Sequence, residues 1–206
     1  RQTPPLAATP AAAKPLPAPP IGEQTAKQIF ATAGLRVVEE RLASTLGEAV
    51  TAATELGFPV ALKIASPDIL HKTEVGGVEL GLTTADEVAA AFAALTGRVR
   101  LARPDARINN VLVSRMVTGG VETILGVQDD PTFGPVVMFG LGGIFVDTLK
   151  DVAFRVAPFA DDEAHRMMRE LKGFRLLEGV RGRPRCDLDA LAAALSALSR
   201  FAAAHA

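Results

Sequence analysis

The chain of 206 residues carries 22 Lys and Arg against 23 Asp and Glu, a formal net charge of −1 at pH 7. Because a nucleic-acid-binding surface needs an excess of Lys and Arg to neutralise phosphates, this balance argues against a nucleic-acid partner. The single cysteine, Cys186, excludes an internal disulfide and a multi-cysteine metal site, which is typical of a reducing compartment. No stretch approaches the roughly 20 uninterrupted apolar residues of a membrane span, so we expect a soluble, cytoplasmic chain with no membrane partner.

Residues 1–20 differ in composition from the rest of the chain. They hold seven of the 14 prolines, with alanine filling most of the gaps. Since proline lacks a backbone N–H and fixes φ, this segment favours an extended polyproline II conformation. We predict an interdomain linker at 1–20 followed by a folded domain at 21–206. The start at Arg1 suggests a piece of a longer polypeptide, and a disordered, processed natural terminus is the alternative.

Helical and strand patterns alternate from residue 21 to about residue 100. Apolar residues spaced three and four apart predict a helix near residues 26–33. The pairs Thr45/Glu48 and Thr84/Glu87 have the spacing of capping boxes, so each predicts the start of a further helix. Residues 60–64 predict a strand, and a second strand is expected to begin at Val78.

Strand patterns dominate the middle of the chain. Short β-rich runs at 108–117, 121–128, 134–139 and 144–149 are separated by Gly, Asp and Pro, and residues 129–134 predict a hairpin turn. Helical patterns return at about 161–172 and from Leu188 to the end of the chain. Consecutive antiparallel strands with segregated helices predict an α+β (mixed α/β) fold rather than a doubly wound parallel sheet.

The familiar nucleotide-binding loops are absent from the sequence. There is no P-loop, and the run that begins at Gly140 has Phe145 where a dinucleotide fingerprint needs its third glycine, so we predict a tight turn there. Lys63 stands out because it lies inside an otherwise apolar strand. Such a lysine either extends its ammonium to the edge of the sheet or holds an anion.

A polar loop with a glycine pair follows this strand at residues 66–78. It contains His71, Lys72, Gly76 and Gly77. Backbone N–H groups near the two glycines, together with Lys63 and Lys72, are the kinds of group that surround a polyphosphate. On spacing alone, an ordinary surface loop is the alternative.

Three segments carry a family resemblance. KIASPDILHKTEVGGVELGL, VLVSRMVTGGVETILGVQDDPTFGPVVMFGLGGIFVDTLKDVAFRVAPF and LLEGVRGRP occur in this order. Together they closely resemble the ATP-grasp domain, or beta subunit, of ADP-forming (NDP-forming) acyl-CoA synthetases, the acetate–CoA ligase group. The resemblance implies an ATP-grasp fold with a small lobe at about 21–105 and a larger antiparallel-sheet lobe at about 106–206, whose C-terminal strands lie beyond Ala206.

The resemblance also implies roles for particular residues. It implies that Lys63 touches the nucleotide phosphates, with Lys72, Gly76 and Gly77 beside it, and that Glu122 is an acid near the nucleotide. The strand whose backbone reads the adenine edge is matched by Val113, Arg115, Met116 and Val117. ATP or ADP and Mg²⁺ are the implied cofactors. In this family the Mg²⁺ ligands follow the last long helix, so we expect no metal ligand before Ala206.

In the resembled family, phosphoryl groups pass through phosphohistidine, the main one lying on the partner subunit or domain. A neutral imidazole with a pKa of about 6.5 is a suitable nucleophile at cellular pH. Our hypothesis is that His71 is the phosphoryl-handling, catalytic residue of this chain. A solvated loop histidine is the alternative.

The function that the resemblance implies is that of a nucleotide-binding domain in an acid–thiol ligase. The overall reaction would be acyl-CoA + ADP + phosphate ⇌ acid + CoA + ATP. The implied partners are CoA-binding and ligase domains or a subunit of the same enzyme, which is expected to be an oligomer. The alternative is a non-catalytic regulatory module fused to an acetyltransferase, and the two are distinguished by what the gene encodes on either side of this chain.

Overall fold

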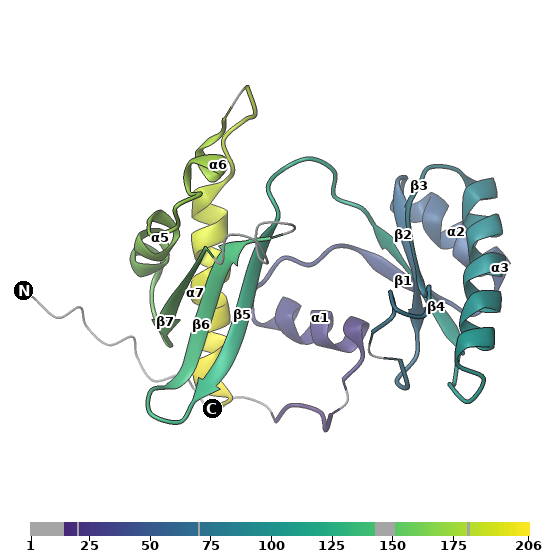
Figure 1. Ribbon diagram of the computed structural model, residues 1–206, viewed down its shortest axis with the longest axis horizontal. Coiled ribbons are helices and arrows are strands. Elements are labelled where there is room, and N and C mark those ends of the chain that lie inside the picture. The colour runs from purple at the N-terminus through teal and green to yellow at the C-terminus, as the bar shows by residue number, and fades with distance from the viewer. Residues whose placement is uncertain (1–14, 20, 70, 143–150, 181) are drawn as a thin grey trace, which may run out of the picture. The chain divides into compact units, whose positions relative to one another are not determined.

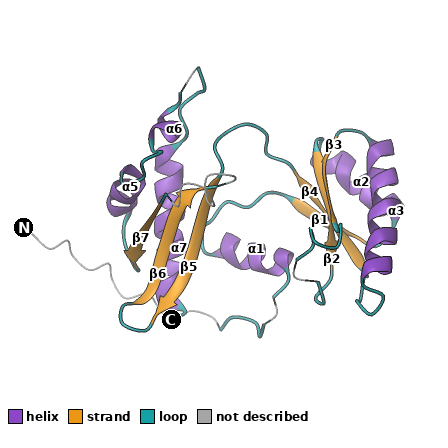
Figure 2. Cartoon of the chain, viewed as in Figure 1, coloured by secondary structure: helices purple, strands orange, loops and turns teal. Residues whose placement is uncertain are grey.

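The computed structural model describes residues 15–19, 21–69, 71–142, 151–180 and 182–206 (Figures 1 and 2). The chain forms two compact units. The N-terminal unit consists of Pro17–Ile29 and Val37–Thr118. Among the described residues, the C-terminal unit consists of 15–16, Phe30–Arg36, 119–142, 151–180 and 182–206. Helix α1 (Glu23–Thr32) therefore contributes residues to both units.

A four-stranded antiparallel sheet forms the centre of the N-terminal unit. Its strand order is β1-β4-β2-β3. The strands are β1 (Glu40–Ala43), β2 (Val60–Ala65), β3 (Val78–Leu82) and β4 (Asn110–Arg115). Helices α2 (Leu46–Leu56) and α3 (Ala85–Ala102) cover one face of this sheet (Figure 1).

Strand β2 determines which side chains face those helices. Val60, Leu62 and Ile64 are fully buried in the core that the helices cover. Because side chains alternate along a strand, Lys63 points to the opposite face of the sheet. Lys63 pairs with Val78 of β3 on one side and with Leu112 of β4 on the other, so it lies in an interior strand.

Both predicted helix starts are found, with one difference in detail. Thr45 and Glu48 form a complete capping box at the start of α2, as predicted. At the start of α3 the Thr84 side chain accepts from the Glu87 N–H, also as predicted. The Glu87 carboxylate, however, accepts from the N–H and the hydroxyl of Thr83, so the reciprocal half of the cap is displaced by one residue.

The C-terminal unit is a three-stranded antiparallel sheet packed against helices. Its strand order is β5-β6-β7. The strands are β5 (Thr123–Asp130), β6 (Gly134–Leu141) and β7 (Val152–Val156), and the helices after them are α5 (Asp161–Arg169), α6 (Arg175–Glu178) and α7 (Leu188–Ala204). Inward side chains of β6, such as Phe139, are fully buried in one cluster with Met167 of α5 and Leu195 of α7. The predicted turn joins β5 to β6, and the Asp130 carboxylate accepts two N–H groups there.

The predicted α+β arrangement of antiparallel sheets with segregated helices is confirmed. The division between the two units differs from the expected one near residue 105. It falls at Thr118/Gly119, because β4 is hydrogen-bonded between β1 and β2 and so belongs to the first sheet. The sequence patterns missed β1 and β7, and the strand predicted at 144–149 lies outside the described residues. No helix among the described residues combines the length and hydrophobicity needed to cross a membrane.

Candidate functional site

The ammonium group of Lys63 is paired with a carboxylate of the same chain, that of Glu23. Its Nζ lies 2.6 Å from Oε1 of Glu23, the first residue of α1. Both side chains are about three-quarters buried, with exposed fractions of 26% and 25%. Of the two interpretations of this lysine, the structure therefore supports an anion holder rather than a chain extended to solvent.

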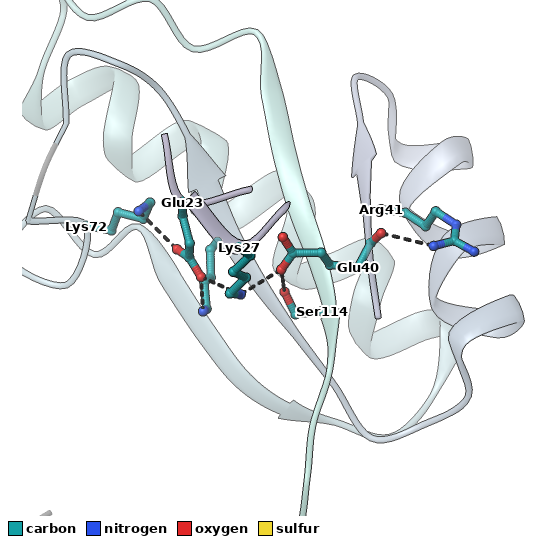
Figure 3. A network of polar contacts seen from close by, with 7 residues as sticks. Glu23, Lys27, Glu40, Arg41, Lys72 and Ser114 are labelled. Atoms are coloured by element: carbon teal, nitrogen blue, oxygen red, sulfur yellow. Dashed lines mark hydrogen bonds and ion pairs between the residues drawn. The ribbon is translucent and has the colours of Figure 1, made fainter. Parts of the chain in front are cut away.

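Glu23 is the centre of a larger ionic network. Its Oε2 lies 3.2 Å from Lys72 Nζ, and its Oε1 also lies 2.9 Å from Lys27 Nζ (Figure 3). Lys27 reaches a second carboxylate, with its Nζ 2.7 Å from Glu40 Oε2. Three ammonium groups thus meet two carboxylates, which leaves one net positive charge at this point of the N-terminal unit.

Hydrogen bonding keeps Glu23 and Lys27 charged despite their burial. Burial raises the pKa of Glu23, but hydrogen bonds from Lys63 and Lys27 outweigh this effect and lower the pKa to about 2. Burial lowers the pKa of Lys27, and its bonds to Glu40 and Glu23 raise it above the ordinary value. Glu40 also accepts from the Ser114 hydroxyl through Oε2, while its buried Oε1 has no hydrogen-bond partner among the described residues.

A cavity of about 400 Å³ brings three of the predicted residues together. Its lining includes Lys63, His71, Lys72 and Glu23. His71 is exposed, so its ring is accessible to a ligand, whereas the two lysines are partly buried and ion-paired. The cavity is large enough for a small ligand or part of one. Two ammonium groups and an imidazole therefore line one cavity.

The glycine pair of the loop has a different role from the predicted one. The Gly76 N–H donates to the Thr73 carbonyl at 3.1 Å, and the Gly77 N–H donates to the Lys72 carbonyl at 2.7 Å. Both donors are therefore used inside the loop and do not offer N–H groups to a polyphosphate. A Cβ on Gly77 would lie 2.9 Å from the Lys72 carbonyl oxygen, so the glycine allows the backbone to turn closely enough to place Lys72.

Two arginines fix the ends of this loop. Arg107 makes two side-chain bonds, of 2.9 and 2.8 Å, to the Asp68 carboxylate, which lowers the pKa of Asp68. At the other end, Arg98 of α3 donates to the Gly76 carbonyl at 3.0 Å and pairs with Glu79. His71 and Lys72 lie between these two attachments.

The residues predicted to read an adenine edge lie on β4 and just after it. Val113 is buried in the core, and its backbone pairs with β1 and β2. The N–H of Arg115 donates to the Glu39 carbonyl and that of Met116 donates to the Pro59 carbonyl. These two N–H groups are therefore engaged within the unit. Val117, in contrast, is 76% exposed.

Glu122 belongs to the C-terminal unit. It is exposed, and its backbone carbonyl accepts from the Gly142 N–H at 2.7 Å.

Sequence reasoning missed Glu23, Lys27 and Glu40. The i, i+4 spacing of Glu23 and Lys27 on a predicted helix was a visible signal for one ion pair. The contacts of Glu23 with Lys63 and Lys72 span 40 and 49 positions of sequence, and no local pattern reports such a contact.

Comparison with known proteins gives the chain its family. The ATP-grasp domain matches residues 20–206. The beta subunit of acetate–CoA ligase [ADP-forming] II of Pyrococcus furiosus is 43% identical over 179 residues, which cover 87% of this chain and 76% of that subunit. Acetate–CoA ligase [ADP-forming] I of Archaeoglobus fulgidus is 45% identical over 172 residues, which cover 84% of this chain but only 25% of that ligase.

Solved structures agree with this result. The dinucleotide-forming acetyl-coenzyme A synthetase 1 of Ca. Korarchaeum cryptofilum superimposes with a TM-score of 0.84 and 42% sequence identity, covering 88% of this chain and 80% of that one. PH1788 of Pyrococcus horikoshii gives a TM-score of 0.81 at 42% identity, covering 88% and 76%. With the family match over nearly the whole chain, these findings show that the chain belongs to the ATP-grasp family and confirm its resemblance to the beta subunits of ADP-forming acetate–CoA ligases.

Proposed function

We propose that this chain is the nucleotide-binding part of an ADP-forming acyl-CoA synthetase, in which it transfers a phosphoryl group between a histidine and the nucleotide. The observation that carries the proposal is the shared cavity of Lys63, Lys72 and His71. The Ca. Korarchaeum cryptofilum synthetase has been solved with a phosphorylated phosphohistidine segment, and also with Mg-AMPPCP and that segment pointing towards the nucleotide site. Both states fit a cavity that combines cations with an imidazole.

The lysines and the imidazole have separate tasks in this proposal. The ammonium groups of Lys63 and Lys72 hold phosphate oxygens and neutralise their charge, which lowers the barrier for phosphoryl transfer. A neutral ring nitrogen of His71 receives the phosphoryl group, so that a P–O bond breaks and an N–P bond forms. In the direction of ATP synthesis the N–P bond breaks, and the phosphoryl group joins a terminal oxygen of ADP.

Mg²⁺ is the cofactor that such a transfer requires, because a divalent cation bridges phosphate oxygens and disperses their charge. The described residues contain no group of three or more His, Cys, Asp or Glu side chains that could hold a metal ion. We assign none of the described residues as a Mg²⁺ ligand.

The wider assignment follows the relatives. We propose the reaction acyl-CoA + ADP + phosphate ⇌ acid + CoA + ATP, with CoA-binding and ligase domains or a subunit as partners, in an oligomeric cytoplasmic enzyme. The chain matches 76% of a beta subunit in one organism and 25% of a ligase in another, which supports partners that are further domains or a further subunit. These relatives are ligases, which favours the catalytic function over a regulatory module.

Replacing His71 by Asn in the enzyme that contains this chain tests the proposal. We expect acyl-CoA-dependent ATP synthesis to fall at least about a hundredfold, because the group that carries the phosphoryl is lost. The matched control is His165→Asn, since His165 lies in α5 and contacts Asp189 rather than the cavity. Equal activity of the His71 variant and the control would remove His71 from the mechanism.

A further inference from the structure

We infer that Glu23 is an internal competitor for phosphate: its carboxylate occupies the anion position between Lys63 and Lys72 and has to leave before a phosphate group binds there. This inference deepens the proposed function and rests on its assignment of the two lysines. It adds a residue that sets the affinity for nucleotide without being part of the transfer itself.

The geometry shows that the anion position is filled. Each carboxylate oxygen of Glu23 contacts one of the two lysines. Oε1 lies 2.6 Å from Lys63 Nζ, and Oε2 lies 3.2 Å from Lys72 Nζ, a contact that Figure 3 shows. Glu23 also lines the cavity that contains His71. The carboxylate thus stands in the space where a phosphate held by both lysines would lie.

A phosphate group and this carboxylate compete for the same place. Both are anions that require the same two ammonium groups, and the carboxylate already occupies the space between Lys63 and Lys72. Binding of phosphate to Lys63 and Lys72 therefore requires movement of Glu23. Its position as the first residue of α1 allows the side chain to swing without breaking the helix.

Lys27 is the group that accepts the displaced carboxylate. It lies one helical turn after Glu23 and already contacts it at 2.9 Å. Glu40 holds Lys27 in place at 2.7 Å, and the second oxygen of Glu40, buried and without a partner among the described residues, is available to accept a further bond from the shifted ammonium. The displaced Glu23 carboxylate thus remains paired with the Lys27 ammonium, which lowers the free-energy cost of replacing it by phosphate.

The test is calorimetric titration of sodium tripolyphosphate into the whole chain, compared between wild type and Glu23→Gln. The apparent dissociation constant of a site that is open only part of the time is the intrinsic constant divided by the open fraction. Removing the carboxylate is therefore expected to tighten binding at least about fivefold. The control is Glu55→Gln on the exposed side of α2, which changes the net charge equally and should leave the affinity unchanged.

Unchanged or weaker binding by the Glu23 variant, or no binding by either chain, overturns the inference. If the variant does not fold, the carboxyl ¹³C resonance of Glu23 in the wild-type chain gives the answer. It should shift on saturation with tripolyphosphate, and a resonance that stays in place contradicts displacement. Tripolyphosphate binding measures the affinity of Lys63 and Lys72 for phosphate and does not depend on phosphoryl transfer to His71. Tighter binding by the variant, together with a fully active His71→Asn enzyme, would therefore uphold the inference while refuting the proposed role of His71.

Discussion

Lys63 Nζ and Glu23 Oε1 lie 2.6 Å apart, although 40 positions of sequence separate the two residues. This ion pair joins the start of α1 to an interior strand of the first sheet, so the first turn of that helix forms part of the candidate site. The same carboxylate reaches Lys72, next to His71 in sequence. Glu23 therefore connects the strand and the loop that contain the predicted phosphate-handling residues.

The ion pairs of Glu23 predict a specific pH dependence of stability. Its pKa is about 2 in the folded chain, against 4.5 for an unperturbed carboxyl. A carboxyl with a depressed folded pKa stabilises the fold fully above its unfolded pKa, and this contribution is lost as pH falls through the folded pKa. The stability advantage of wild type over Glu23→Gln should thus be constant above about pH 5 and shrink towards pH 2. Chemical denaturation of both chains across this range checks it, and a constant difference would show that the pair is not ionised as described.

Gly77 is predicted to be intolerant of a side chain. A Cβ there would lie 2.9 Å from the Lys72 carbonyl oxygen, a backbone atom that cannot move aside without opening the loop. We expect Gly77→Ala to lower the free energy of unfolding by about 1–3 kcal/mol. Gly97→Ala is the control, because Gly97 lies inside α3 with no atom near its Cβ position. That substitution should stabilise the chain by about 0.5–1 kcal/mol, and similar effects at both positions would refute the argument.

Asp151 is predicted to stabilise the C-terminal unit through its carboxylate. It is only 8% exposed and accepts the N–H groups of Lys172 and Gly173 at 2.9 and 2.8 Å. Asp151→Ala should cost about 1–3 kcal/mol for each donor left without a partner, and Asp151→Asn should cost less because one acceptor remains. Urea denaturation measures the difference, with the exposed Asp105→Ala as control. A loss no greater than that of the control would mean that water satisfies both donors.

Much of the fold was predictable because its signals are local. The capping residues Thr45 and Thr84 predicted two helix starts, and the Asp-rich turn before Gly134 predicted the β5–β6 hairpin. Strand β1 was missed because its sequence, ERLA, carries two charges in four residues and lacks the alternation of a buried strand. Its strand character comes from its pairing with β4, a contact between distant segments.

The candidate site was predictable in its residue types but not in its contacts. A lysine in an apolar strand and a loop with His71 and Lys72 indicated anion chemistry, and the structure does bring these residues to one cavity. The N–H groups of the two glycines were expected to face a ligand. They instead donate to the carbonyls of Thr73 and Lys72, which belong to the same loop. Glu23 was missed because its partners are distant in sequence.

The central claim is that the Lys63 strand holds the phosphates of a nucleotide. The most direct measurement is calorimetric titration of Mg-ADP into the enzyme that contains this chain, in wild type and Lys63→Met. The matched control is Lys172→Met, since Lys172 is exposed and belongs to the C-terminal unit. We expect Lys63→Met to weaken Mg-ADP binding at least about tenfold, because a charge-assisted contact to phosphate is lost. Equal dissociation constants for wild type, Lys63→Met and Lys172→Met would contradict it.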